Sequence, residues 1–280
     1  MYRIYILSHN RPDFISQCIK SVERAVSGIS DVEVIISENS PSSNVLDLLK
    51  KESIESTIRK RKNYMNGLEH INFCLNEAKS DGMKYVCIFH DDDQMFPEFV
   101  TKTLRAFQEN NIAPACGFDI SKKYKNFEIE KYSKKNMMSY IFSIGKSSII
   151  PFPSFTYNLE IIGELCLDET IGKHADAEFL LRVAEKGDIV IIKSTQIKSE
   201  VHPQSDSYNE SINHRRKFIN AVIERHNYDK SMFIPYRMAY ILRKKQFNRP
   251  NFRVFISKRL LPIFISHVLN YLKSFYRKNR

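Results

Sequence analysis

The chain has 280 residues, of which 43 are Lys or Arg and 32 are Asp or Glu, giving a formal net charge of +11. A hydrophobic fraction of 42% argues against a disordered chain and is enough for a sizeable core. No run of 18 apolar residues is present, which argues against a transmembrane helix.

The positive charge is confined to the C-terminal fifth of the chain. Residues 230–280 contain 13 Lys or Arg and no Asp or Glu, whereas residues 1–229 contain 30 basic and 32 acidic residues, a net charge of −2. This distribution argues against a nucleic-acid-binding core. We expect one near-neutral domain over residues 1–229 and a basic extension over residues 230–280.

The cysteines and the N-terminus indicate a reducing compartment. The five cysteines are odd in number and lack CxxC spacing, so free buried thiols are expected rather than disulfides. The apolar stretch that ends at Leu7 is too short for a signal peptide. We therefore expect a cytoplasmic protein.

Strands and helices alternate through residues 1–118. Short runs rich in Val, Ile and aromatic residues predict strands, and apolar residues recurring every three or four positions predict helices. The predicted strands are Arg3–Leu7, Val32–Ser37, a short strand at Ile58, Val86–Phe89 and Ala113–Phe118, and the predicted helices are Pro12–Val26, Val45–Leu49, Leu68–Ala78 and Pro97–Phe107. This alternation predicts an α/β fold with a mostly parallel sheet, helices on both faces and right-handed connections.

The pattern is looser after Phe118. Residues Lys122 to Lys135 are polar, with a short strand near Phe127 and Ile129, and form either a loop over the site or a solvated excursion. Further on, we predict helices at Leu159–Leu165 and Asp176–Lys186, a strand at Ile189–Ile192 and a polar loop at Glu200–Ser207.

The predicted strand Val86–Phe89 leads into three consecutive carboxylates, Asp91, Asp92 and Asp93. Adjacent like charges repel strongly at the end of a buried strand unless a cation neutralises them. Oxygen ligands suit Mg²⁺ or Mn²⁺, and ligands of open α/β sheets bind beyond the carboxyl ends of strands. The cluster is therefore a candidate metal site, and the alternative is a solvated acidic turn.

Five stretches in this order resemble the family 2 glycosyltransferases, particularly bacterial enzymes that assemble surface polysaccharides such as O-antigen or capsule. The stretches are Tyr5–Phe14, Ile36–Ser40, Asn63–Ala78, His90–Asp93 and Asp176–Gly187. Two positions depart from the family's pattern, because Glu38 replaces the usual Asp and Ala175 replaces the usual Glu. The resemblance implies a GT-A fold, a nucleotide-sugar donor, Mg²⁺ or Mn²⁺ and inversion at the anomeric carbon.

The resemblance also implies roles for the N-terminal loops and the acidic triplet. Ser8, His9 and Arg11 would lie beside the nucleotide base and phosphates, and Glu38 would contact the ribose or the base. Asp93 best matches the metal-binding aspartate. Asp91 or Asp92 would be the partner that contacts ribose or metal, because three consecutive aspartates can be aligned with the family's motif in two ways. We take Asp91 with Asp93 as the predicted metal pair.

Asp176 matches the general base that accepts the proton of the attacking hydroxyl, a contribution of typically 10²–10⁴-fold. The local sequence also allows Asp176 to be a helix N-cap. Glu178 is a rival base but points about 200° away around the helix, and His174 reads as a surface histidine. His202 matches a histidine near the diphosphate or metal, with a polar loop residue as the alternative. Asn66 and Asn72 are expected to be structural.

The basic extension ends in an amphipathic pattern. Leu261, Ile265, Val268, Leu272 and Phe275 share one helical face, with polar and basic residues opposite. The 13 residues Leu260–Leu272 include Pro262 and are too few to span a bilayer, so the pattern indicates an element lying on an anionic membrane surface. The alternative is a helical bundle packed on the domain or on a second subunit.

We expect an inverting, metal-dependent transferase that extends a lipid-linked saccharide at the inner face of the membrane. A sugar nucleotidyltransferase would normally need a glycine-rich phosphate loop, and Ser8–Asp13 contains no glycine. The third reading is a nucleic-acid-binding protein that stacks bases on the aromatic residues of its tail. The apolar stripe of the tail and the near-neutral domain argue against it.

Overall fold

The computed structural model describes residues 1–52, 54, 56–121, 127–142, 150–199, 212–228 and 233. The predicted basic extension, apart from Phe233, and His202 lie outside these described residues. Among the helices that are described, none is long and apolar enough to cross a membrane.

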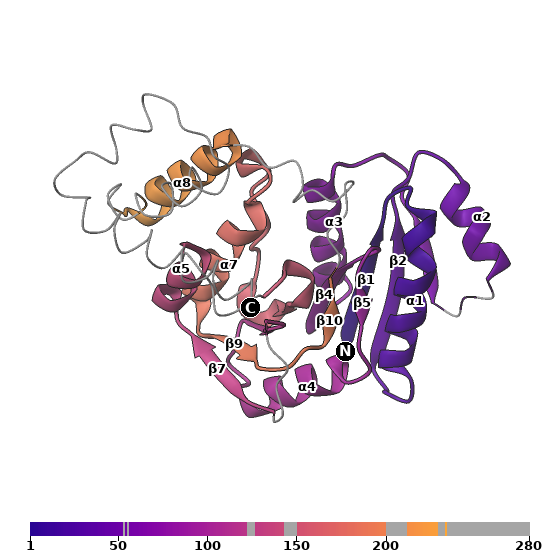
Figure 1. Ribbon diagram of the computed structural model, residues 1–280, viewed down its shortest axis with the longest axis horizontal. Helices are drawn as coiled ribbons and strands as arrows, with labels where there is room; N and C mark the ends of the chain where they lie inside the picture. The colour runs from indigo at the N-terminus through magenta and orange to yellow at the C-terminus, as the bar shows by residue number, and fades with distance from the viewer. Residues whose placement is uncertain are drawn as a thin grey trace, which may run out of the picture.

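Within the described residues, an eight-stranded sheet forms the centre of the molecule (Figure 1). Its order is β3-β2-β1-β4-β8-β6-β9-β7. The strands are β1 (Tyr2–Ser8), β2 (Val32–Glu38), β3 (Thr57–Lys60), β4 (Tyr85–His90), β6 (Ala115–Phe118), β7 (Ile129–Tyr132), β8 (Thr156–Asn158) and β9 (Ile189–Ile192). Only β7 and β8 run against the others. A small second sheet pairs β5 (Gln94–Met95) with β10 (Ile197–Lys198).

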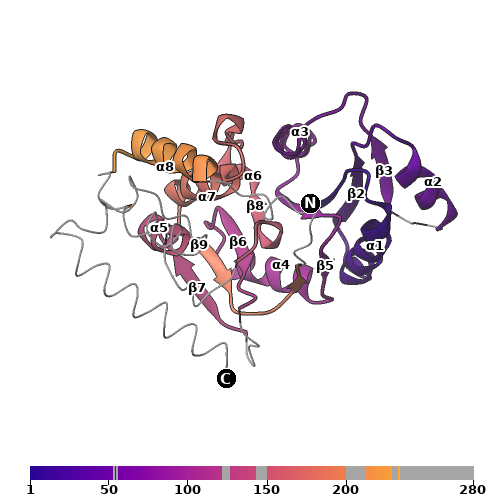
Figure 2. The same cartoon turned by 45° about the horizontal axis from the view of Figure 1, so that its top comes forward.

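Helices cover both faces of the sheet, as predicted (Figure 2). One face is covered by α1 (Pro12–Val26), α2 (Asn44–Lys51) and α4 (Phe99–Glu109). The other is covered by α3 (Gly67–Ser80), α5 (Lys134–Phe142), α6 (Leu159–Ile162), α7 (Ala175–Lys186) and α8 (Ile212–His226). Every residue of β1 is buried, which follows from its central place with helices on both sides.

The strand–helix alternation predicted for residues 1–118 is confirmed, and the later part differs. The predicted helix Leu159–Leu165 is only the four-residue α6, which ends where Gly163 adopts a φ of 56°. Before it, β8 inserts antiparallel between β4 and β6, so the sheet is mixed. At three residues, β8 is too short to show a periodic pattern.

The fold brings the predicted loops to one edge of the sheet. Because β1, β2 and β4 are parallel neighbours, the residues that end them, Ser8, Glu38 and His90, lie at the same edge. The five cysteines are free, and four are buried. Asn66 caps α3 by accepting the amides of Leu68 and Glu69, so it is structural as expected.

Candidate active site

The ends of β1 and β2 are joined by hydrogen bonds to a fully buried Glu38 carboxylate. Ser8 Oγ donates to Glu38 Oε2 at 2.5 Å, and the backbone N–H of Ser40 donates to Oε1 at 2.6 Å. Lys60 Nζ lies 3.9 Å from the same Oε1. Glu38 therefore organises the two loops at this edge, and both its oxygens are already engaged by the protein.

Asp91 is a buried carboxylate neutralised by the loop after β1. Arg11 Nη2 lies 2.6 Å from Asp91 Oδ1 in an ion pair that lacks hydrogen-bond geometry, and the backbone N–H of His9 donates to Oδ2 at 3.3 Å. Burial raises the pKa of Asp91 to about 7, although the charge of Arg11 and the His9 amide act in the opposite direction. Arg11 also donates from Nη1 to Asp92 Oδ2 at 2.8 Å, so one guanidinium joins two carboxylates.

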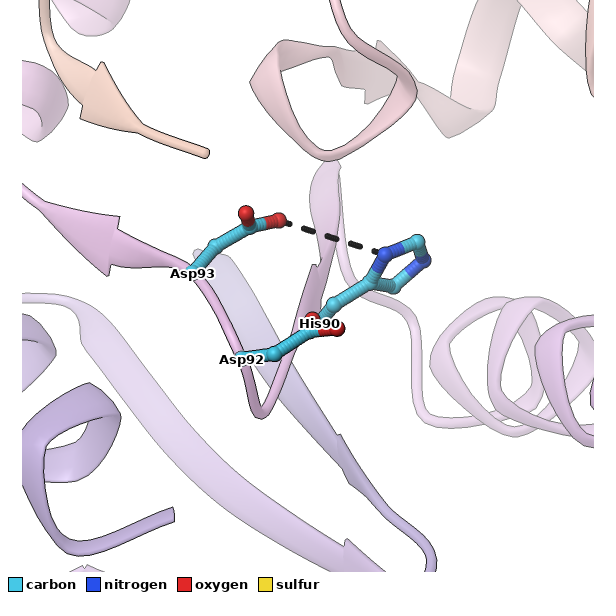
Figure 3. Close-up of side chains that lie close together, drawn as sticks. All are labelled: His90, Asp92 and Asp93. Atoms are coloured by element: carbon cyan, nitrogen blue, oxygen red, sulfur yellow. Dashed lines mark ion pairs between the residues drawn. The ribbon is translucent and has the colours of Figure 1, made fainter. Parts of the chain in front are cut away.

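His90, Asp92 and Asp93 form the group of potential metal ligands among the described residues. One ligand atom from each lies within 4.8 Å of the others. Figure 3 shows the Asp93 carboxylate pointing toward the His90 imidazole, and Asp93 Oδ2 lies 3.9 Å from His90 Nδ1. Two carboxylates with an imidazole suit Mn²⁺, since imidazole favours transition metals and carboxylate suits Mg²⁺ and Mn²⁺. The donor set therefore fits a divalent cation.

The end of β4 and the turn that follows it position the side chains of this group. Successive side chains of a strand point to opposite faces, and Phe89 is buried on the α1 side of the sheet. His90 therefore projects to the other side, and a turn with an Asp93 N–H to His90 C=O bond of 3.3 Å reverses the chain into β5. The predicted metal pair was Asp91 with Asp93, whereas the geometry groups Asp92 with Asp93 and leaves Asp91 with Arg11.

Asp176 lies in the first turn of α7, one residue after its start. The N-cap is His174, so the N-cap reading of Asp176 is wrong. Asp176 Oδ1 accepts the neighbouring Ala177 N–H at 2.8 Å. Burial raises the pKa of Tyr157, and the charge of Asp176 raises it further; Asp176 acts in the same way on Tyr140, so both tyrosines lie near this carboxylate.

Glu178, the rival base, is held in a buried ion-pair cluster. Its carboxylate accepts Arg182 Nε at 2.9 and 3.0 Å and Arg225 Nη1 of α8 at 2.5 Å. Its side chain is fully buried. This arrangement is structural, because the carboxylate is enclosed and neutralised by two arginines. His174 is partly buried against the Phe218 ring, with ring centroids 5.2 Å apart.

A line of aromatic rings connects the metal-ligand group to the surroundings of Asp176. The Phe152 ring, in the short helical turn Phe152–Ser154, lies 6.3 Å from His90 and 6.2 Å from Tyr157, measured between centroids. The hydroxyl of Tyr157 is buried and has no hydrogen-bond partner among the described residues. His90 and Phe152 were not predicted as site residues; for His90, its place directly before the three aspartates was the available signal.

Comparisons with known proteins identify a family and a fold. The sequence profile of the family described as Glycosyl transferase family 2 matches residues 4–161, more than half of the chain. A search of curated proteins finds no match.

Solved structures share the fold at low sequence identity. TarS residues 1–349 from S. aureus, in complex with UDP-GlcNAc, matches with a TM-score of 0.63 and 12% identity over 95% of this chain and 79% of that chain. The mannosyltransferase PcManGT from Pyrobaculum calidifontis, in complex with GDP-Man and Mn²⁺, matches with a TM-score of 0.59 and 9% identity over 96% and 84% of the two chains. The match to a longer S. aureus TarS structure covers only 47% of that chain.

Proposed function

The chain belongs to glycosyl transferase family 2, and from this membership we propose that it transfers a sugar from a nucleotide-diphosphate sugar to a saccharide hydroxyl with inversion. The observation that carries the proposal is the convergence of His90, Asp92 and Asp93 beside Arg11 at the carboxyl edge of the sheet. Solved structures with this fold have been determined with UDP-GlcNAc and with GDP-Man and Mn²⁺.

His90, Asp92 and Asp93 are the residues that would hold a divalent cation, Mn²⁺ or Mg²⁺. When bound, such a cation supplies positive charge that stabilises the departing diphosphate. Asp91 then has a separate task, because its carboxylate is buried and paired with Arg11. Arg11 is partly exposed and offers a second positive charge next to the same place.

The nucleotide would lie along the ends of β1 and β2. His9 is exposed and its ring lies 5.5 Å from that of Tyr64, which is also exposed, so two aromatic rings border the edge beside Ser8 and Glu38. Glu38 would act through the loops that it ties together, with its hydrogen-bonded oxygens facing Ser8 and Ser40. His202 would approach the diphosphate or metal from the polar loop after β10.

Asp176 would be the base that takes the proton of the acceptor hydroxyl. Its place in the first turn of α7 favours the ionised carboxylate, because the N-terminal end of a helix carries partial positive charge. A direct displacement needs one such base. Glu178 is a poor rival because it is enclosed by Arg182 and Arg225.

The acceptor would be a lipid-linked saccharide of bacterial surface-polysaccharide assembly. Residues 1–229 would form the catalytic domain, and the basic residues of 230–280 would hold it at the anionic inner face of the membrane. An enzyme whose acceptor stays in the bilayer would have to work at the membrane surface, and such a tail would keep it there.

The experiment is a screen of nucleotide sugars with Mn²⁺ for thermal stabilisation, followed by assay of donor hydrolysis or transfer. We expect activity to require the metal and to be abolished in Asp93→Ala and in Asp92→Asn. Activity that persists in EDTA would contradict the metal-dependent mechanism. Arg105→Met, on the exposed side of α4, is the control and should retain activity.

A further inference from the structure

We propose that Arg11 is an internal counter-ion that competes with the divalent cation for Asp92, so that the guanidinium weakens metal binding at this carboxylate. The inference rests on the proposed metal site and adds to it a competitor within the chain. It predicts that removing one particular positive charge tightens metal binding, without any new ligand.

The contacts of Arg11 place it on a metal ligand. Nη1 donates to Asp92 Oδ2 at 2.8 Å, while Nη2 is 2.6 Å from Asp91 Oδ1. Asp92 is also a member of the group with His90 and Asp93. A charge-assisted bond to a ligand carboxylate is strong, and here it engages Oδ2 of Asp92 and offsets negative charge that would attract a metal. The guanidinium and a cation at this group would therefore compete.

The two contacts of Arg11 differ in how easily they break. Asp91 is fully buried, so separating Arg11 from it would leave an unpaired charge in the interior, which is costly. The Asp92 side chain is 9% exposed and the Arg11 side chain 25% exposed, so their contact borders solvent. Asp91 is thus the anchor that keeps Arg11 beside the site, and Asp92 is the contact that can be exchanged.

The sequence supports this division. Arg11 immediately precedes α1 and is its N-cap residue, so the start of the helix fixes its backbone beside the site. The backbone N–H of His9 also donates to Asp91, at 3.3 Å. After displacement from Asp92, the free half of the guanidinium would remain at the site with hydrogen-bond donors available to a diphosphate.

The test measures Mn²⁺ binding to the full-length protein without nucleotide, by calorimetry or by the electron paramagnetic resonance of free Mn²⁺. Arg11→Met should bind Mn²⁺ about tenfold more tightly than the wild type, because a charge a few ångströms from the cation is removed. Lys60→Met removes a charge at the same sheet edge, beside Glu38, and should keep the wild-type dissociation constant.

A double variant separates competition from general electrostatics. Arg11→Met with Asp91→Asn removes one charge of each sign, which leaves the net charge of the site unchanged and avoids an unpaired buried carboxylate. It should also bind Mn²⁺ about tenfold more tightly, because the competing bond from the guanidinium to Asp92 is lost. Wild-type or weaker affinity in this variant would overturn the proposal, and weaker affinity would indicate that Asp91 itself is a ligand.

The result distinguishes this inference from the proposed function. If the wild type binds Mn²⁺ and neither variant binds it more tightly, the competition by Arg11 is refuted while the metal site stands. If no form binds Mn²⁺, both the metal site and the competition are refuted. Circular dichroism of each variant confirms that the compared proteins are folded.

Discussion

At the residue scale, the carboxylates of the site differ in their surroundings more than in their chemistry. Asp91 is enclosed and paired, Asp92 and Asp93 converge with His90, and Glu178 is held between two arginines. Asp176 is partly buried at the start of a helix. Carboxyl groups with the same intrinsic acidity are therefore suited to different tasks by burial and by their neighbours.

Asp176→Asn should separate donor binding from transfer. The amide cannot accept the proton of the acceptor hydroxyl, so we expect kcat to fall by about 10²–10⁴-fold while donor affinity is retained. Steady-state transfer kinetics with donor titration measure both quantities.

Glu178→Gln is the matched control for Asp176→Asn, two residues along the same helix. It breaks charge-assisted bonds to Arg182 and Arg225, so it should lower the free energy of unfolding by about 2 kcal/mol and leave the folded enzyme active. Near-normal turnover in Asp176→Asn would exclude Asp176 as the base.

His70 should make stability depend on pH. It is buried, its Nε2 lies 2.6 Å from Ser37 Oγ, and burial lowers its pKa from 6.5 to about 4, assisted by the charge of Arg61. Because the unfolded chain takes up this proton near pH 6.5 and the folded protein does not until about pH 4, stability should decline as the pH falls through that window.

Urea unfolding at pH 7 and pH 5 tests this linkage. The wild type should lose about 2 kcal/mol more than His70→Gln between the two pH values, since groups common to both proteins cancel in the comparison. Equal losses would show that His70 is not the titrating group.

At the element scale, β6 packs closely against the segment before β8. A Cβ added to Gly117 would lie 2.5 Å from Cε1 of the Phe155 ring, a distance that side chains do not tolerate. Phe155 is fully buried and stacks on Tyr157, so its ring has little room to move. Gly117 therefore allows β6 and this segment to approach.

Gly117→Ala should destabilise the protein by about 1–3 kcal/mol through overpacking. Gly67→Ala is the control, because a Cβ there meets no atom within 4 Å. Adding Phe155→Leu to Gly117→Ala should recover part of the loss relative to the sum of the single variants. Strictly additive values from urea unfolding would argue against the clash.

At the scale of the whole molecule, the charged residues are unevenly distributed along the chain. The acidic and basic side chains of residues 1–229 nearly balance, and the excess of 13 basic residues follows them. This distribution is the reason for our proposal that the basic residues hold a catalytic domain at an anionic surface.

The tail should bind anionic vesicles. Replacing Lys273, Arg277 and Lys278 with Gln in the full-length chain should weaken binding to phosphatidylglycerol vesicles, by about 1 kcal/mol per charge. A triple variant with Gln in place of the exposed Lys50, Lys51 and Lys186 of the domain controls for net charge and should bind like the wild type. Binding to RNA without binding to vesicles would refute the membrane role.

The sequence by itself determined the parts of the protein that local patterns encode. The strands of residues 1–118 follow from short runs rich in Val, Ile and aromatic residues, and the helices follow from apolar residues at a period of about 3.6. The five ordered motifs placed the chain in its family, and the position of Asp91–Asp93 after a buried strand identified the acidic site.

Only the tertiary structure showed the strand pairings and ion pairs between residues that are distant in the sequence. The insertion of β8 between β4 and β6 joins strands far apart in the chain, and no local period encodes that pairing. The pairing of Arg11 with both Asp91 and Asp92 spans about 80 residues and exists because β1 and β4 are adjacent. Charge and burial act through space, so the different surroundings of these carboxylates cannot be read from the sequence and follow from the arrangement of the strands and helices.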